Sequence, residues 1–422
     1  MSVGGKGFFK NEAISFTLPD GWDLLAMAEP TTVPGAEDVS AVVKEAINNP
    51  IAMEKLDTLF PLENPKVAII VDDQTRPTPA YQVLMPLIEI LTSLGVKDDD
   101  IDIVMGRGTH KVADEPTIRG KIGDEAYERF RFTMHDPDDA AKLTYMGTTS
   151  RGNKVRINSV VAGAGLVIAI GLSNPHYFAG YGGGPKIMLP GVSSRETIAY
   201  NHHMISDPKT VPDILEGNPI WEDMLEAARI AKLAMKIDVV LNQDQAIYKV
   251  FAGEVEAAQA AAVEALKEVY GVPVPKMSDV TIASGFPLET NMIQSGKALL
   301  NADMITKKGG VVILISACSE GAGPMYYETL SERPDPETVI EWIGIGKASP
   351  TGGPMAARVR ELLKSKKLII VTDGVSPEQL TDMEMTHAPT VEEALEIAAI
   401  DHPNAEVTIL PVGGSTLPIL PQ

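Results

Sequence analysis

Short runs of β-branched residues alternate with longer segments of helical period along most of this chain. This alternation constrains the fold most strongly, because it is typical of α/β proteins, in which helices follow strands and cover the faces of a sheet. Helices are expected at 80–96, 221–234 and 254–271. Strands are expected at 66–72, 101–106 and 164–171 in the first half of the chain, and at 279–285, 309–317, 366–374 and 405–411 in the second.

The length of 422 residues exceeds what one ordinary core accommodates, so we expect two α/β domains with the functional site in a cleft between them. The segment VPVPK at 272–276 contains two prolines and follows a helix that ends at Gly271, so we predict the hinge there. The N-terminal catalytic and cofactor-binding domain would span 1–271, and the C-terminal domain would span 277–402. Residues 403–422 either close the second sheet or return to the first domain.

The charge balance restricts the partners of the chain. With 36 basic and 57 acidic side chains the net charge is −21, which argues against binding to nucleic acid or to an anionic membrane. The apolar run at 160–171 is too short to span a bilayer, and the first residues lack the pattern of a signal peptide, so a cytoplasmic protein is expected. Cys318 is the single cysteine of the sequence, so any metal must use nitrogen, oxygen or the sulfur of a cofactor.

Polar and ionisable side chains follow three of the predicted strands directly. Asp72 and Asp73 open the segment DDQTRPTP, His110 lies in RGTHK, and His176 lies in LSNPHYF. In open α/β sheets ligands bind outside the carboxyl ends of the strands, so these three loops are expected to meet at one edge. An aspartate there can also serve only to cap a turn, and we expect one of the tandem pair to be structural.

Two further features separate functional side chains from ordinary ones. Pro77 and Pro79, which closely follow Arg76, restrict the backbone around it, which suits an arginine that binds a carboxylate or phosphate. A single histidine is more often packing than chemistry, and His135, His387 and His402 are interpreted in that way. His110 and His176 differ because each lies in a Gly- or Pro-containing loop after a buried strand.

The segment SNPHYFAGYGGGPKIMLPG at 173–191 combines clustered glycines with Lys186. It is not a P-loop, because Pro185 separates the glycines from the lysine and Ile187 replaces the hydroxyl residue. Glycines this close together are typical of backbone that approaches a ligand closely. We therefore interpret this segment as a binding loop for a group other than a nucleoside triphosphate.

Two predicted helices carry the remaining candidates. Ser193 and Glu196 have the spacing of a capping box, so a helix is expected to start there and to turn His202 inward with Ile198. His202 is then either a core histidine or a metal ligand. In the second domain Gln294 and Lys297 are three residues apart on one helical face; they either reach a substrate or form a solvated pair.

The motifs DDQTRPTP, GTH, PHYFAGYGGGPK, NHH and GFPLETNMIQSGK together resemble, in this order, those of the nickel-pincer lactate racemase family. The resemblance extends from about residue 60 to about residue 300. It implies a nickel-pincer nucleotide, which is a pyridinium-3,5-bisthiocarboxylic acid mononucleotide with Ni, and enzymes that synthesise this cofactor as partners.

The same resemblance assigns roles by position. Lys186 would carry the cofactor covalently, and His202 would donate a nitrogen to nickel, completing the planar ligand set that Ni(II) favours. His110 and His176 would be the acid/base pair on opposite faces of the substrate carbon. Arg76, Gln294 and Lys297 would bind the substrate. The residues expected to bind the cofactor besides Lys186 are Asp73, Thr75, Gly182, Gly183 and Gly184, the glycines by leaving room for a planar group.

The implied reaction is inversion of the 2-carbon of a small anionic 2-hydroxy acid. One histidine would remove the hydroxyl proton while hydride passes from the substrate carbon to the cofactor, and return of hydride to the other face would invert the centre. The loop departs from the lactate-type pattern at Gly183 and Pro185, and Trp342 is a candidate for the aromatic residue of the second domain. Lactate, a larger 2-hydroxy acid, malate and a sugar acid therefore all remain possible substrates.

Two other classes of protein fit the same residues. A metal-dependent hydrolase would use His110, His176 and His202 as direct ligands and leave Lys186 free. A ligand-binding protein without catalysis would use the same two-domain framework. A classical NAD dehydrogenase is less consistent, because GRGTHK and GAGLVI each lack the full G-x-G-x-x-G motif.

Overall fold

The computed structural model describes residues 4–349 and 352–421 and divides into two compact units. We call Thr32–Val269 the internal unit, and Met1–Thr31 together with Tyr270–Gln422 the terminal unit, because it contains both ends of the chain. Each unit is built on a six-stranded sheet, which confirms the prediction of two α/β domains.

The sheet of the internal unit has the order β13-β12-β9-β4-β5-β6. All neighbours are parallel except β12 and β13. Every residue of β4, β9 and β12 is buried, as expected for parallel strands covered on both faces. The strands are β4 (Val67–Asp72), β5 (Ile101–Gly106), β6 (Arg131–Met134), β9 (Leu166–Leu172), β12 (Met235–Leu241) and β13 (Ile247–Gly253).

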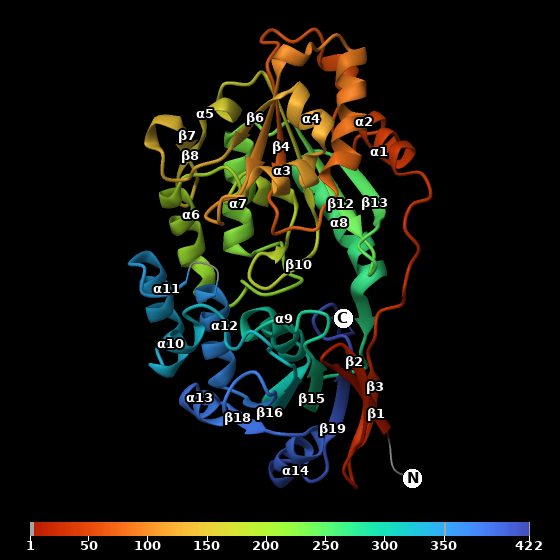
Figure 1. Ribbon diagram of the computed structural model, residues 1–422, viewed down its shortest axis with the longest axis vertical. Helices are drawn as coiled ribbons and strands as arrows, with labels where there is room; N and C mark the ends of the chain where they lie inside the picture. The colour runs from red at the N-terminus through yellow and green to blue at the C-terminus, as the bar shows by residue number, and fades with distance from the viewer. Residues whose placement is uncertain (1–3, 350–351, 422) are drawn as a thin grey trace. The chain divides into compact units, whose positions relative to one another are not determined.

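The helices of the internal unit lie around this sheet, as Figure 1 shows for α2 and α8. One apolar cluster joins the strands to α1 and α2, and it contains Leu84, Leu87 and Leu91 of α2, all fully buried. The hairpin of β7 (Leu143–Thr148) and β8 (Lys154–Asn158) lies outside the sheet. The helices are α1 (Val39–Asn48), α2 (Ala80–Ser93), α3 (Glu115–Ile122), α4 (Asp124–Arg129), α5 (Ser159–Ala162), α6 (Arg195–His202), α7 (Pro219–Ile230) and α8 (Val255–Tyr270).

The sheet of the terminal unit has the order β18-β17-β16-β15-β19-β3, and all of its neighbours are parallel. Two small sheets accompany it, β1 (Gly4–Phe9) with β2 (Glu12–Thr17), and β14 (Gly271–Pro273) with β20 (Leu417–Ile419). The large sheet contains β3 (Asp23–Met27), β15 (Ser278–Ser284), β16 (Thr306–Ile315), β17 (Lys367–Val371), β18 (Thr386–Ala388) and β19 (Glu406–Leu410). The helices are α9 (Met292–Asp303), α10 (Tyr326–Ser331), α11 (Pro336–Gly344), α12 (Gly353–Leu363), α13 (Pro377–Asp382) and α14 (Val391–Asp401).

The structure corrects the predicted domain boundaries. Residues Met1–Thr31 belong to the terminal unit because β3 pairs with β19, so the first and last parts of the chain lie side by side (Figure 1). Residues 403–422 belong to the same unit, since β19 and β20 both pair within it. The division after Val269 lies just before the predicted hinge at 272–276, where Val272 and Pro273 form a strand instead of a free connector. Such long-range pairings leave no local mark in the sequence.

The elements that carry the site follow the predictions closely, with one correction. Helix α6 begins at Arg195, and its N-cap is Ser194, whose hydroxyl accepts a hydrogen bond from the Thr197 amide; Ser193 instead donates to the Met188 carbonyl. Within the described ranges, no helix has both the length and the apolar character needed to cross a membrane.

Candidate active site

The topology of the internal sheet brings the predicted loops to one edge. From β4 the chain proceeds to β5 and β6 on one side, whereas β9 and β12 lie on the other side. The change of direction between β4 and β9 makes this a topological switch point, where the loops that follow the two strands diverge. Asp73, Thr75 and Arg76 follow β4, His110 follows β5, and His176 follows β9 in the short strand β10 (Pro175–His176) (Figure 1).

His110 is oriented by Asp73. The Asp73 Oδ2 atom lies 2.6 Å from His110 Nδ1, and Oδ1 accepts hydrogen bonds from the Thr75 amide at 3.0 Å and the Thr75 hydroxyl at 2.6 Å. Burial of Asp73 opposes its ionisation, but the hydrogen bonds and charge of His110 and the hydrogen bonds of Thr75 outweigh this effect, so the pKa of Asp73 is lowered. An ionised Asp73 can only accept, so Nδ1 carries a proton, and in the neutral form of the ring Nε2 presents a lone pair. His110 is therefore arranged as a base.

Asp72 is the structural member of the tandem pair. Its Oδ2 accepts hydrogen bonds from the Thr78 hydroxyl at 2.6 Å and from the Leu172 amide at 3.0 Å. Its Oδ1 lies 2.7 Å from Nζ of Lys121, which also donates to the Arg76 carbonyl at 2.8 Å. Asp72 thus fixes the loop that carries Asp73 and Arg76, in agreement with the predicted division of roles.

The glycine-rich segment packs differently from the prediction. A Cβ atom at Gly183 would lie 2.3 Å from Ser173 Oγ and 2.4 Å from Asp238 Oδ1, and one at Gly184 would lie 2.1 Å from Gln259 Oε1. A Cβ at Gly182 would likewise lie 2.2 Å from Asn174 Oδ1. Protein atoms therefore occupy the space beside these glycines, and this close packing, together with the positive φ of Gly183 and Gly184, accounts for them.

Lys186 lies at the end of this segment with its amine beside His176. Its Nζ is 2.6 Å from His176 Nε2 and 5.2 Å from the centre of the Phe178 ring. Burial, and secondarily the charge of Arg76, lower the pKa of Lys186 well below its usual value. A neutral amine is a nucleophile, so Lys186 is suited to forming a covalent bond.

His176 is held in the opposite tautomer to His110. The backbone amides of Phe178 and Ala179 both point at His176 Nδ1, at 3.5 and 3.3 Å. Because an amide can only donate, Nδ1 accepts and the proton of the neutral ring is on Nε2, facing the Lys186 amine. His110 therefore presents a lone pair at Nε2, whereas His176 presents an N–H group there.

His202 is the C-terminal residue of α6, and its neighbour Asn201 sets its tautomer. Asn201 Nδ2 donates to Asp223 Oδ2 and to the Ile220 carbonyl, both at 2.9 Å, so its Oδ1 faces His202 Nδ1 at 3.2 Å. Burial lowers the pKa of His202 to about 3. The ring is thus neutral with its proton on Nδ1, and Nε2 can donate to a metal.

Phe178 contacts all three of these side chains. It was not among the predicted site residues, and its position in PHYF was the signal that could have indicated it. The edge of its ring contacts His176 at 4.4 Å and His202 at 5.1 Å between ring centres. Together with the Lys186 contact, these packing distances show that His176, Lys186 and His202 share one buried environment. Asn201 and Asp238 were also missed; a signal for Asp238 was a charge inside the apolar run KIDVVL.

The other predicted site residues belong to the terminal unit. Gln294 is exposed and Lys297 is half-buried on α9 of the terminal unit, where the Asn291 side chain caps the helix by accepting from the Gln294 amide. Their predicted role in binding the substrate stays a prediction. Trp342 lies on α11, with Lys347 Nζ 3.5 Å from its ring centre.

The histidines interpreted as structural behave in that way. His135 is fully buried with Nε2 2.9 Å from the Ser193 carbonyl, and burial lowers its pKa to about 4. His387 Nε2 lies 3.1 Å from the Thr372 carbonyl. Cys318 is buried, as predicted.

Two observations bear on the alternative classes. Among the residues that the structure describes, no three His, Cys, Asp or Glu side chains are grouped to hold a metal ion directly, so the three-histidine site of a hydrolase is not formed.

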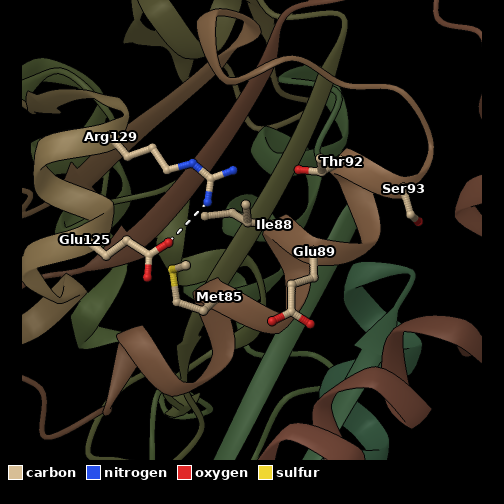
Figure 2. Close-up of a pocket in the computed structure, with 7 residues that line it drawn as sticks. All are labelled: Met85, Ile88, Glu89, Thr92, Ser93, Glu125 and Arg129. Atoms are coloured by element: carbon tan, nitrogen blue, oxygen red, sulfur yellow. Dashed lines mark hydrogen bonds and ion pairs between the residues drawn. The ribbon is translucent and has the colours of Figure 1, made fainter.

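A surface hollow of about 540 Å³ lies between α2 and α4, and Figure 2 shows that its lining includes Met85 and the Glu125–Arg129 ion pair. It contains none of the predicted site residues.

Comparison with known proteins identifies the family of the chain. Residues 9–212 match the family model of the lactate racemase N-terminal domain, and residues 274–417 match that of the C-terminal domain. Lactate racemase of Thermoanaerobacterium thermosaccharolyticum is 33% identical over 385 residues, which is 89% of each chain. Lactate racemase of Lactiplantibacillus plantarum is 33% identical over 379 residues, covering 88% of this chain and 89% of that one.

Solved structures show the same relationship. The lactate racemase apoprotein from T. thermosaccharolyticum superposes with a TM-score of 0.87 at 29% identity, covering 100% of both chains. A Thermotoga maritima protein with a TM-score of 0.63 and 17% identity shares the fold. From these matches over almost the whole chain, we conclude that the protein belongs to the lactate racemase family and is an isomerase of the racemase type.

Proposed function

We propose that this protein inverts the 2-carbon of a small 2-hydroxy acid, with lactate as the simplest substrate, and that it uses a nickel-pincer nucleotide attached to Lys186. The observation that carries the proposal is the opposite proton state of the two imidazoles at the edge of the internal sheet. Asp73 makes His110 an acceptor at Nε2, and backbone amides make His176 a donor at Nε2. Inversion requires an acid and a base that can exchange roles, which this pair supplies.

The residues of the site fit the cofactor. Lys186 has the neutral amine that covalent attachment requires, and His202 has a neutral ring with its Nε2 lone pair available for nickel. Sulfur from the protein is not required, because the cofactor brings its own. When bound, the group supplies an acceptor and donor of hydride for the substrate carbon.

The chain itself then has three tasks. His110 Nε2 would accept the hydroxyl proton of one enantiomer while the 2-carbon gives up its hydride, and the two losses together leave a planar 2-keto acid. His176 Nε2 would donate a proton to the oxygen as hydride returns to the carbon and the other enantiomer forms. The roles reverse for the opposite direction. The Arg76 guanidinium, whose Nη1 lies 3.4 Å from the Thr75 hydroxyl, binds the carboxylate beside these rings. Attachment at Lys186 would also release His176 Nε2 from the amine it contacts now.

The test requires protein produced together with the cofactor-synthesis enzymes. Intact-mass spectrometry should find an adduct of mononucleotide size on Lys186, and a chirality-resolved panel of lactate, malate, longer 2-hydroxy acids and sugar acids should show which substrate is inverted. Lys154, which is exposed, provides a matched control: Lys154→Ala should keep the adduct and Lys186→Ala should lose it. Full racemisation by Lys186→Ala, or no inversion of any 2-hydroxy acid by protein that carries the adduct, would contradict the proposal.

A further inference from the structure

We propose that Asp238, neutralised by Lys236, is a positioning residue that anchors the loop of Lys186 beside the loop of His176. This inference rests on the proposed function, because it assigns a purpose to the placement of Lys186. Asp238 and Lys236 are both fully buried in β12, which is the direct neighbour of β9 in the sheet.

Asp238 joins the two loops through one oxygen atom. Its Oδ1 accepts a hydrogen bond from the Ser173 hydroxyl at 2.8 Å and from the Gly184 backbone amide at 2.9 Å. Ser173 begins the loop that leads to His176, and Gly184 lies two residues before Lys186. A single carboxylate oxygen thus fixes the two segments whose side chains meet at Lys186 Nζ and His176 Nε2.

Among the carboxylates of the described residues, Asp238 is the ion-pair partner of Lys236. Its Nζ lies 2.9 Å from Asp238 Oδ1 and donates to the Ile237 carbonyl at 2.7 Å. A buried ion pair of this kind is usually poor support for stability, because desolvation of both charges offsets their attraction. A pair of apolar residues would fill β12 without that cost, so the presence of the ion pair points to another purpose.

The glycine loop is shaped to reach this oxygen. A side chain at Gly183 would collide with both Asp238 Oδ1 and Ser173 Oγ, so the backbone can approach only as glycine. From the other side Gln259 Nε2 donates to the Gly182 carbonyl at 3.1 Å, and Trp221 Nε1 donates to Gln259 Oε1 at 2.8 Å. Gly182 and Gly184 are therefore each held by a buried side chain, which leaves Lys186 little freedom to move from His176.

Two double variants separate anchoring from charge. In Lys236→Met/Asp238→Leu the ion pair is replaced by apolar residues and the loop loses its acceptor. In Lys236→Met/Asp238→Asn the charge is also removed, but an amide oxygen remains to accept from Ser173 and Gly184. The two variants are matched in net charge and in the number of side-chain heavy atoms at residue 238, and they differ in the acceptor.

The measurement is made on protein without cofactor, so that it does not depend on racemisation. The rate of acetylation of Lys186 by acetic anhydride is measured by peptide mass spectrometry, relative to that of Lys154. We expect the leucine variant to change this relative rate by at least about tenfold, because Lys186 leaves its buried position, and the asparagine variant to stay within about twofold of the original. Melting temperatures close to the original, or higher, would show that the variants are folded.

An unchanged rate in the leucine variant, or an equal change in both variants, would overturn the proposal. Amide exchange of Gly184 in the unaltered protein gives a second test that needs no variant, since slow exchange is expected and fast exchange would contradict the anchor. Failure of the proposed function has a different signature, which is normal Lys186 reactivity without any nucleotide adduct in the protein made with the cofactor-synthesis enzymes.

Discussion

The two units have closely similar sheets but very different groups at the ends of their strands. The internal unit has two buried ion pairs on its strands. Asp72, at the carboxyl end of β4, pairs with Lys121, and Asp238, in the middle of β12, pairs with Lys236. At the ends of β15, β16 and β17 in the terminal unit the corresponding groups are uncharged hydroxyls, Ser284, Ser316 and Thr372.

The hydroxyls of the terminal unit form ordinary local contacts. Ser316 Oγ lies 2.7 Å from Ser295 Oγ, Thr372 donates to the Ala317 carbonyl at 3.0 Å, and Ser284 donates to the Phe8 carbonyl at 2.8 Å. Such contacts satisfy buried polar atoms at little cost, whereas buried charges are expensive to desolvate. The comparison teaches that the fold alone does not create the site, because the same sheet architecture carries different groups in the two units.

The largest expected difference between the units concerns their histidines. His110→Ala in the cofactor-loaded protein should lower kcat for both enantiomers by about 10²–10⁴-fold, because one proton transfer loses its catalyst. His387→Asn, in the terminal unit, should leave kcat nearly unchanged, since the imidazole of His387 is bonded to the Thr372 carbonyl of the same unit. Racemisation followed by chiral chromatography checks both, with intact mass as the control for cofactor attachment. Comparable losses in the two variants would remove the distinction between the units.

The sequence predicted this difference only in part. The strands that end at Asp72, Gly106 and Leu172 were found from their apolar runs. The loops after them, which carry His110 and His176, were recognised because parallel strands share one carboxyl edge. Family motifs supplied the roles of Lys186 and His202. These predictions depend on residues that are neighbours along the chain.

Contacts between distant segments could not be predicted in the same way. Three such contacts join Asp238 to Gly184, Asn201 to Asp223, and β3 to β19. In each case the local sequence pattern of one segment does not indicate which distant segment it contacts. The glycines show the same limit: their clustering was interpreted as room for a ligand, whereas the side chains of Ser173, Asp238 and Gln259 occupy the space beside Gly183 and Gly184.

A pair of glycines, one in each unit, sharpens the comparison at the level of packing. Gly183 and Gly309 have similar positive φ angles, of 76° and 80°. A Cβ at Gly183 would collide with buried polar atoms, whereas a Cβ at Gly309 would meet nothing within 4 Å. Gly309→Ala should therefore cost only about 1–2 kcal/mol for the left-handed backbone, and Gly183→Ala should cost about 1–3 kcal/mol more for overpacking.

Urea unfolding followed by circular dichroism measures both costs in the protein without cofactor. Gly183→Ala should also alter the reactivity of Lys186, because the loop has to shift away from Asp238. Equal destabilisation by the two substitutions would mean that Gly183 is packed no more tightly than Gly309, which has open space beside it.

The smallest expected effect compares two lysines by the pH dependence of stability. Burial lowers the pKa of Lys186 well below its usual value of 10.5, whereas hydrogen bonds from Lys307 to Asp279 and Glu406 raise the pKa of Lys307. Folding therefore disfavours the protonated amine of Lys186 relative to the unfolded chain. The resulting cost is greatest below the folded pKa and disappears as the pH passes 10.5.

Lys186→Met should accordingly raise the melting temperature of the cofactor-free protein at neutral pH, by at least about 2 °C, and the gain should shrink toward about pH 10. Lys307→Met should do the opposite, because it removes a favourable pair; the loss should be no more than about 1 kcal/mol since that pair is partly exposed to solvent. Differential scanning calorimetry at the two pH values gives both signs in one series. A lower melting temperature for Lys186→Met at neutral pH would mean that the amine is charged in the folded protein, which would remove its suitability as the attachment point.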